Sequence, residues 1–298
     1  MKSDSETLVG LPVVRHPNFA FKDVPRDWYG NEPVLTCFVN ALHLFIPDGE
    51  NFFVRTILDS SQSTIDQGLR LQVQRFAGQE ASHSLLHREY QVMLVMQGYE
   101  IESWLTWYQN LAYKRMESTR SPLLNLSITV ALEHLISSLG EWILKPGHSL
   151  GDRADPTMAA LFRWHAAEEI EHKSVAFDVF QNISGNIFIR WAGMIIASGE
   201  ILCFWLSASQ HLMRQDARIT IRSILACWSR NHELNLVVPH LLHAAWSFLW
   251  PGFHPAKIDN NKLASNWLKS ESMKSTMTGA KSKAINQTKQ GVACHLDG

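Results

Sequence analysis

The sequence predicts an all-α protein: a four-helix bundle with a dinuclear metal site, followed by additional helices. Three observations predict this architecture. Apolar residues recur three and four positions apart over long segments, which is the period of an amphipathic helix. No segment shows the alternation of apolar and polar residues between hairpin turns that marks strands. The motif Glu-x-x-His occurs twice within the helical segments, at Glu80–His83 and Glu169–His172.

The composition limits the class of protein. The chain has 298 residues, of which 46% are hydrophobic, and its formal net charge is −1. Without a basic excess, the sequence gives no basis for nucleic-acid binding. The four scattered cysteines fit reduced thiols, and the polar N-terminus lacks a secretory pattern, so we expect a cytoplasmic protein. The 14 histidines favour a search for metal ligands.

The helices are delimited by start and stop signals. Pro47-Asp48-Gly49 interrupts an apolar pattern, so we expect one helix before it and another, capped by Asp48, after it. Gly98 is a plausible C-terminal stop, and Ser121-Pro122 and Asp155-Pro156 each begin a helix. The expected helices run over 34–45, 49–60, 65–98, 100–117, 121–145, 156–182 and 187–212. A loop at 19–33, rich in aromatic and turn residues, is expected to pack over the bundle.

Metal-ligand spacing is clearest near residue 170. His165, Glu169 and His172 are four and then three residues apart, so they project from one stripe of a helix. Apolar residues flank the stripe, and burying a carboxylate with two imidazoles requires compensation, for which a divalent metal is suited. In chain order the helices offer a lone Glu50, the first Glu-x-x-His, a lone Glu133 and the second Glu-x-x-His.

This order is the pattern of ferritin-like di-iron and di-manganese carboxylate proteins. The charges also balance, because four carboxylates carry about four negative charges and two divalent ions carry four positive charges. Mixed carboxylate and imidazole donors suit iron and manganese and also bind zinc.

The chain resembles a bacterial family of predicted metal-dependent hydrolases with a ferritin-like fold. The resemblance covers about residues 14–268. It rests on the segment at 14–31, Phe-Ile-Pro-Asp-Gly-Glu at 45–50, Phe-Ala-Gly-Gln-Glu-Ala-Ser-His at 76–83, His-Ala-Ala-Glu-Glu-Ile-Glu-His-Lys at 165–173 and Pro-Gly-Phe-His-Pro at 251–255. It implies a metal centre more than a particular reaction.

A narrower resemblance concerns the ligand helices alone. The run His-x-x-x-Glu-x-x-His is similar to that of the p-aminobenzoate N-oxygenase family, di-iron enzymes with a third histidine ligand. By position, this resemblance implies that His165 is the extra ligand. The complete implied set is Glu50, Glu80, His83, Glu133, His165, Glu169 and His172.

Other residues compete for these roles. His87 shares the stripe of Glu80 and His83, so it is a rival for the extra ligand or a hydrogen-bond partner of a ligand; we favour His165. Glu168 is expected to be solvated or to support a ligand, while His134 and Glu171 are expected at the surface. The remaining histidines without a paired carboxylate are assigned to surface or core: His148, His211, His232, His240, His243 and His254. The aromatic residues Trp104, Trp107 and Tyr108 are assigned to the core rather than to a cofactor site.

The C-terminal third is strongly apolar. Residues 187–212 approach the length of a membrane span, but Arg190 and Glu200 interrupt them, and a charge at bilayer depth costs about 3 kcal/mol. We therefore expect a buried helix, or an apolar face for a membrane, a second copy or a substrate. The tryptophan-rich segment 241–253 is expected in the core, with an interfacial anchor as the alternative.

The expected division is an arm at 1–20, a ferritin-like metal-binding core at 21–183, additional apolar helices at 184–269 and a disordered tail at 270–298. Peripheral membrane association and a homodimer are both compatible with the apolar helices.

The leading expectation for function is a non-haem di-iron carboxylate enzyme that uses dioxygen to oxidise a small, apolar organic substrate. Two Fe ions are the expected cofactors, with Mn or Zn as alternatives, and no catalytic residue is expected beyond the ligands. An external electron donor is required, because no flavin or nicotinamide motif is present. The alternative is a metal-dependent hydrolase that uses a metal-bridging hydroxide. A second alternative is a non-catalytic, membrane-associated metal-binding protein.

Overall fold

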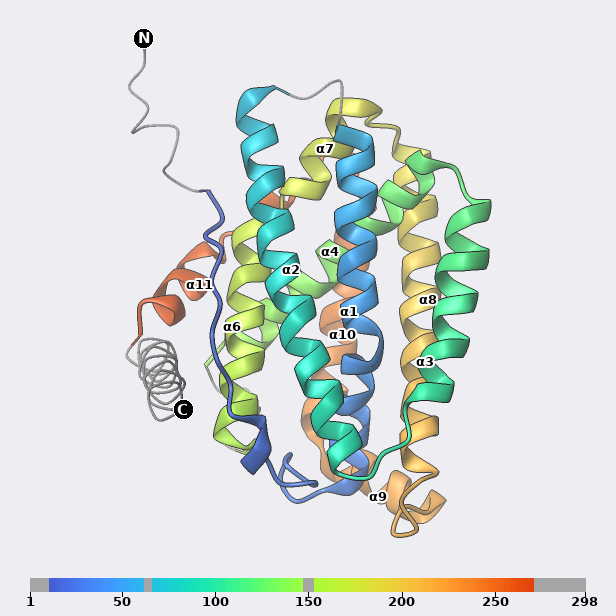
Figure 1. Cartoon of the computed structure of the whole chain (residues 1–298). Helices are drawn as coiled ribbons and strands as arrows, with labels where there is room; N and C mark the ends of the chain where they lie inside the picture. The colour runs from blue at the N-terminus through green and yellow to red at the C-terminus, as the bar shows by residue number, and fades with distance from the viewer. Residues whose placement is uncertain (1–10, 62–65, 147–152, 271–298) are drawn as a thin grey trace, which may run out of the picture.

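The computed structural model describes residues 11–61, 66–146 and 153–270, without the side chains of 232–234. Within these residues the chain is helical, and the nearest approach to a strand is one isolated bridge between Tyr29 and Ala154. The prediction of an all-α fold is confirmed (Figure 1). The elements are η1 (Phe21–Asp23), α1 (Pro33–Ser61), α2 (Gln67–Met96), α3 (Glu102–Gln109), η2 (Asn110–Glu117), α4 (Pro122–Leu144), α6 (Pro156–His172), α7 (Val175–Ile183), α8 (Ile187–Met213), α9 (Ile221–Arg230), α10 (His232–Phe248), η3 (Pro255–Lys257) and α11 (Asn261–Leu268).

The helices α1, α2, α4 and α6 form the bundle, and α8 and α10 pack on the outside of α4 (Figure 1). The core of the described residues has two large apolar clusters and a small one formed by Ala167, Ile170 and Ala264. On α2, Tyr90 belongs to one cluster and Phe76 to the other; on α1, Leu44 and Phe53 are divided in the same way. The buried carboxylates of both helices, Glu50 and Glu80, lie between these positions together with His83, so the bundle has a polar layer between two apolar regions.

Helix α1 is continuous through Pro47, so the prediction of two helices separated at residues 47–49 is wrong. Proline has no N–H, which leaves the carbonyl of His43, four residues earlier, without its helical donor. Gln91 of α2 replaces that donor: its Nε2 lies 2.9 Å from His43 O and 3.2 Å from Leu44 O. A contact from a neighbouring helix therefore compensates for the proline.

Two other expected helices are interrupted. The segment 100–117 consists of α3 followed by the wider π-helical turns of η2. The segment 156–182 is divided between α6, which ends at His172, and α7, which begins at Val175. At this division Lys173 is buried and donates hydrogen bonds to Ile258 O, to Asn260 and to Asn261 Oδ1. The C-terminal segment is therefore anchored directly beside the end of α6.

The predicted start and stop signals are confirmed where they involve side-chain caps. Ser121 accepts a hydrogen bond from Leu124 N at the start of α4, and Asp155 accepts two at the start of α6. Gly98 follows α2 with a φ of +87°, which favours glycine at this stop. The prediction that residues 19–33 pack over the bundle is also confirmed, since Trp28 is buried and donates to Asn40 Oδ1 at 2.8 Å.

Among the described residues, two helices are long and apolar enough to cross a membrane by length and composition, but they differ in burial. In α4 the most apolar window is 72% buried, whereas in α8 it is only 28% buried. Of the two predictions for residues 187–212, an outward apolar face therefore describes α8 better than a buried helix does. Its outward residues include Phe188, Ile195 and Leu202, and in the last expected segment Trp246 and Trp250 are exposed. That a membrane, a second copy or a substrate covers these faces stays a prediction. The expected tail at 270–298 lies outside the described residues, except for Ser270.

Candidate metal centre

The structure brings together all seven residues proposed as ligands. Helix α1 contributes Glu50, α2 contributes Glu80 and His83, α4 contributes Glu133, and α6 contributes His165, Glu169 and His172. Each is at most 8% exposed. Their donor atoms form a first group, Glu50, His83 and His165, and a second group, Glu80, Glu133, Glu169 and His172; within each group the atoms lie within 4.8 Å of one another.

The second group is arranged around one imidazole nitrogen. His172 Nε2 lies 3.1 Å from Glu169 Oε2, 3.2 Å from Glu80 Oε1 and 3.3 Å from Glu133 Oε2. Three carboxylates and one imidazole that converge in this way are a donor set for a divalent ion.

The first group is adjacent and shares neighbours with the second. Glu50 Oε1 lies 4.0 Å from His83 Nδ1 and 3.9 Å from His165 Nε2. Glu169 faces both groups, because its Oε1 lies 2.8 Å from His165 Nε2 and its Oε2 faces His172. Glu80 Oε1 is likewise 3.6 Å from His83 Nδ1. Glu80 and Glu169 therefore lie between the two groups of donor atoms.

Several polar atoms of the centre have no hydrogen bond within the described part of the chain. Both carboxylate oxygens of Glu50, Glu80 and Glu133, and Nδ1 of His83, are buried without a hydrogen bond. Such atoms are costly to bury unless a ligand satisfies them. The centre therefore has the donors that two cations require and lacks other groups to satisfy them.

The electrostatics agree with this interpretation. Burial, followed by repulsion from neighbouring carboxylates, raises the pKa of Glu50 and Glu80 well above the usual range. Burial also raises the pKa of Glu133, to about 7. Burial would raise the pKa of Glu169 too, but His172 and the hydrogen bond from His165 hold it well below the usual range. Four buried carboxylates thus need positive charge, and two divalent ions supply the matching amount.

Glu168 orients His83 from outside the centre. The carboxylate is fully buried, so the alternative that Glu168 is solvated is wrong. Its Oε2 lies 3.1 Å from His83 Nε2, while its Oε1 accepts hydrogen bonds from Trp164 Nε1 and Arg15 Nη1. A carboxylate that accepts the outer N–H of an imidazole leaves the inner nitrogen free to bind a metal. Here that inner nitrogen is His83 Nδ1.

A second support involves residues that the sequence analysis missed. Gln79 Oε1 lies 3.0 Å from His172 Nδ1, and Gln79 Nε2 donates to Glu171 Oε2 at 3.0 Å. Glu171 also pairs with Arg15 at 2.7 Å, and its side chain is 23% exposed, so it lies at the edge of the surface rather than free in solvent. Gln79 lies four residues before His83 on the same stripe, which is a usable signal. Arg15 lies in a segment without helical periodicity, so no sequence signal marks it.

His134 is also not at the surface, contrary to expectation. It is buried because α10 covers the outer side of α4: His134 Nε2 lies 3.0 Å from Ala244 O, and the ring stacks on Phe248. Other histidines contact groups away from the centre: His211 with Glu100 O, His240 with Ser138 O and His254 with Asp178. His243 is exposed, while His148 and the side chain of His232 lie outside the described residues.

The aromatic residues expected in the core are only partly there. Trp104 and Tyr108 are buried and stacked on each other, but Trp107 is 45% exposed. His87 lies directly behind His165, with its Nε2 2.7 Å from His165 Nδ1, and it belongs to neither group of donor atoms. The preference for His165 over His87 as a ligand stays a prediction.

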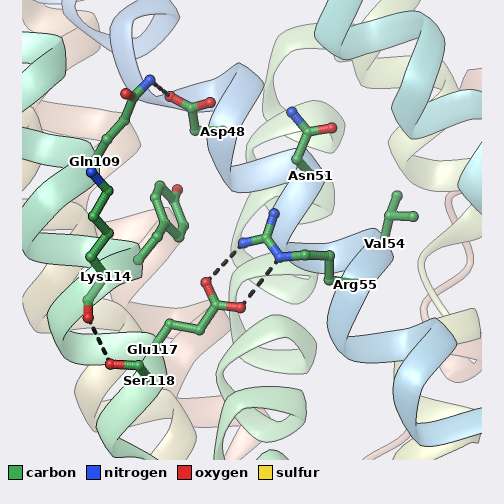
Figure 2. Close-up of a pocket in the computed structure, with 9 residues that line it drawn as sticks. Asp48, Asn51, Val54, Arg55, Gln109, Lys114, Glu117 and Ser118 are labelled. Atoms are coloured by element: carbon green, nitrogen blue, oxygen red, sulfur yellow. Dashed lines mark hydrogen bonds and ion pairs between the residues drawn. The ribbon is translucent and has the colours of Figure 1, made fainter.

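A cavity of about 830 Å³ lies beside the centre, between α1 and the segment α3–η2 (Figure 2). It is lined by Asp48, Asn51, Val54, Arg55, Gln109, Tyr113, Lys114, Glu117 and Ser118. None of the seven proposed ligands lines it. Asn51 forms part of its wall one residue after Glu50, and it donates to Ser84 Oγ, one residue after His83. The cavity is thus separated from the centre by the ligand helices themselves.

The fold and these contacts define an all-helical protein with a buried carboxylate and histidine centre suited to metal ions. The chain belongs to the family described as predicted metal-dependent hydrolase, whose model matches residues 13–259. Neither the curated proteins nor the solved structures gave a match. The family resemblance seen in the sequence is therefore confirmed as membership of this family, whereas the ferritin-like fold attributed to it and the narrower resemblance to an N-oxygenase stay predictions.

Proposed function

We propose that this chain is a dinuclear metal-dependent hydrolase. The observation that carries the proposal is the convergence of seven buried donor residues in a chain of this family. Both carboxylate oxygens of Glu50, Glu80 and Glu133 have no hydrogen bond in the described residues. Two divalent ions bound here would supply Lewis acidity and lower the pKa of a water molecule to make a nucleophile near neutral pH.

The residues of the chain then have distinct roles. Glu80 and Glu169 lie between the two groups of donor atoms, and the other five proposed ligands complete these groups and would hold the ions with them. Glu168 and Gln79 hold His83 and His172 with the required nitrogen turned inward. Burial keeps bulk water away from the centre, which strengthens each electrostatic contact inside it.

A second candidate is oxidation of a small organic substrate with dioxygen and an external electron donor. The donor set favours it, because oxygen and imidazole ligands suit iron and manganese. The closed surroundings also favour it, since each proposed ligand is at most 8% exposed and a reactive species would be protected. The family description favours hydrolysis over this candidate.

Purification under low oxygen, followed by elemental analysis, tests both candidates. The hydrolase predicts about two bound ions and turnover of ester, amide or phosphoester probes by the zinc or manganese form without oxygen. Substrate-linked oxygen uptake by the iron form, with no anaerobic turnover, would support the oxidase instead. The double variant Glu80→Gln/Glu169→Gln is the control and should lose both metal and activity.

The same samples test the third expectation, a non-catalytic protein associated with a membrane. Its motivation is the outward apolar face of α8. Flotation with anionic vesicles and sedimentation without them measure membrane and self association separately. Association that persists in the metal-free double variant, together with no turnover by any metal form, would favour that expectation over both enzymes.

A further inference from the structure

Three buried imidazoles form a chain that leads away from the metal centre. His165 Nδ1 lies 2.7 Å from His87 Nε2, and His87 Nδ1 lies 2.7 Å from His43 Nδ1. At the inner end, His165 Nε2 faces Glu169 Oε1 at 2.8 Å. At the outer end, His43 Nε2 is buried without a hydrogen-bond partner in the described residues. We call His43, His87 and His165 the imidazole chain.

The three rings are held in place by α1, α2 and α6, one from each helix. His43 stacks on Tyr90 with ring centroids 3.8 Å apart and meets the edge of Phe162 at 5.0 Å. His87 and His43 are at most 1% exposed, so the ring nitrogens exchange no hydrogen bonds with bulk water. The order of contacts along the chain is therefore fixed by packing.

The rings are taken as neutral because they are buried among Tyr90 and Phe162, where a positive charge without a partner is costly. A neutral imidazole has one N–H and one lone pair. In each contact between two ring nitrogens, one must donate and the other accept. The tautomer of one ring therefore determines the tautomers of the other two, and only two arrangements of the chain are consistent.

Metal at the centre selects one arrangement. His165 Nε2 can bind an ion only with its lone pair, so its proton is on Nδ1 and is donated to His87 Nε2. His87 then carries its proton on Nδ1 and donates it to His43 Nδ1, which leaves the proton of His43 on Nε2. Without metal, the opposite arrangement is favoured, because His165 Nε2–H then donates to the carboxylate of Glu169 and no N–H of the imidazole chain lacks an acceptor.

We propose that His87 and His43 are positioning residues that hold His165 in the tautomer required of a ligand, and that metal binding reverses the direction of the whole imidazole chain. Each ring keeps one N–H. One proton leaves His165 Nε2 for solvent, one passes from His87 to His165 and one from His43 to His87. His43 Nε2 gains one proton from water that reaches this buried ring during local opening of the fold. This inference rests on the proposed metal centre but concerns a residue two imidazoles away from it.

Tautomers can be read directly by nitrogen NMR of protein labelled with ¹⁵N-histidine, using zinc alone as a diamagnetic probe. We expect His43 to be the Nδ1–H tautomer in the metal-free protein and the Nε2–H tautomer after zinc loading, with assignment from a His43→Gln sample. An unchanged tautomer of His43 in protein shown to bind two zinc ions would overturn the inference and leave the metal centre intact. Failure to bind zinc, iron or manganese would overturn both.

Variants of His87 provide an independent readout. His87→Phe fills the space but ends the chain, and we expect zinc affinity at the first group to fall roughly 10–100-fold while the second group is retained. His87→Gln is the matched control: its amide can accept from His165 Nδ1–H and donate to His43 Nδ1, so it should restore most of the affinity. Equal, wild-type affinity in both variants would contradict the proposed role. Equilibrium dialysis with zinc measures the affinities, and circular dichroism confirms the fold.

Discussion

At the scale of single residues, Glu168 shows how an outer contact determines a ligand. Its two oxygens have different partners, with Trp164 and Arg15 on Oε1 and His83 on Oε2. In Glu168→Gln the amide oxygen is kept on the side of the two donors, so the amide NH₂ faces His83 Nε2. We expect His83 to change tautomer and lose the lone pair on Nδ1, which reduces metal affinity roughly 10–100-fold.

Zinc titration of the purified variant measures this effect. The matched control is Arg15→Gln, which removes one donor to Glu168 Oε1 but keeps Trp164 Nε1 on that oxygen and Glu168 Oε2 on His83 Nε2. It should lose much less affinity than Glu168→Gln. Comparable losses in the two variants would show that Arg15, rather than the orientation of His83, is responsible.

Glu133 predicts a pH dependence of stability in the metal-free protein. Its pKa is raised to about 7 by burial, from 4.5 in an unfolded chain. A carboxyl with a raised pKa stabilises the fold below pH 4.5 and loses that contribution as pH rises toward 7. We therefore expect stability to fall over this range by up to about 1.4 kcal/mol per pH unit from this group.

Urea denaturation of metal-free protein at several pH values tests this expectation. In Glu133→Gln the part of the slope between pH 4.5 and 7 should be reduced, because the group no longer titrates. The same dependence of stability on pH in the metal-free variant and the metal-free wild type would contradict the prediction, because it would mean that the carboxyl of Glu133 is solvated. The sequence could indicate that Glu133 points inward, but the size of its pKa shift depends on three neighbouring helices and could not be predicted.

At the scale of helices, the glycines of α8 provide a test of packing. A Cβ at Gly193 would lie 2.6 Å from Ser127 O of α4 and closer still to Ser127 Oγ, whereas a Cβ at Gly199 would meet nothing within 4 Å. Gly193→Ala should therefore separate α8 from α4 and cost about 1–3 kcal/mol. Gly199→Ala should gain up to about 1 kcal/mol, because alanine favours the helix. Thermal unfolding measures the change in stability of each variant relative to wild type. A loss of stability in both variants would mean that the face around Gly199 is covered.

The helices also show which elements a sequence can predict. The caps at Ser121 and Asp155 are local, so they were predictable from a few neighbouring residues. The continuity of α1 through Pro47 was not, because the hydrogen bond that replaces the missing one comes from Gln91 on α2. Likewise, spacing places His165, Glu169 and His172 on one stripe of α6. Only tertiary packing reveals that Arg15 supports that stripe from 150 or more residues away.

At the scale of the whole molecule, the polar layer makes stability and metal binding opposed requirements. Two apolar clusters lie along the bundle on either side of the layer and stabilise the fold. The layer itself is destabilising without cations, since its carboxylates are buried and lack partners among the described residues. Ions that bind only the folded chain add stability by mass action, about 4 kcal/mol at a thousand times the dissociation constant.

This opposition predicts that one substitution, Glu80→Gln, stabilises the metal-free protein but reduces the stability that bound metal adds. Glu80 has both oxygens unpartnered in the described structure, and burial together with Glu169 raises its pKa well above the usual range. In the metal-free protein at pH 7, Glu80 must therefore either take up a proton or bear an unfavourable charge, and Glu80→Gln relieves both costs. The variant should be more stable than wild type without metal and gain much less stability from added zinc.

Urea denaturation with and without zinc measures both differences. The control is Glu117→Gln, which removes only a surface pair with Arg55 and should change the stability of either state by less than about 1 kcal/mol. A metal-free Glu80→Gln protein less stable than wild type would mean that the carboxylate stabilises the fold through contacts with the protein alone, and the layer would then need no cation.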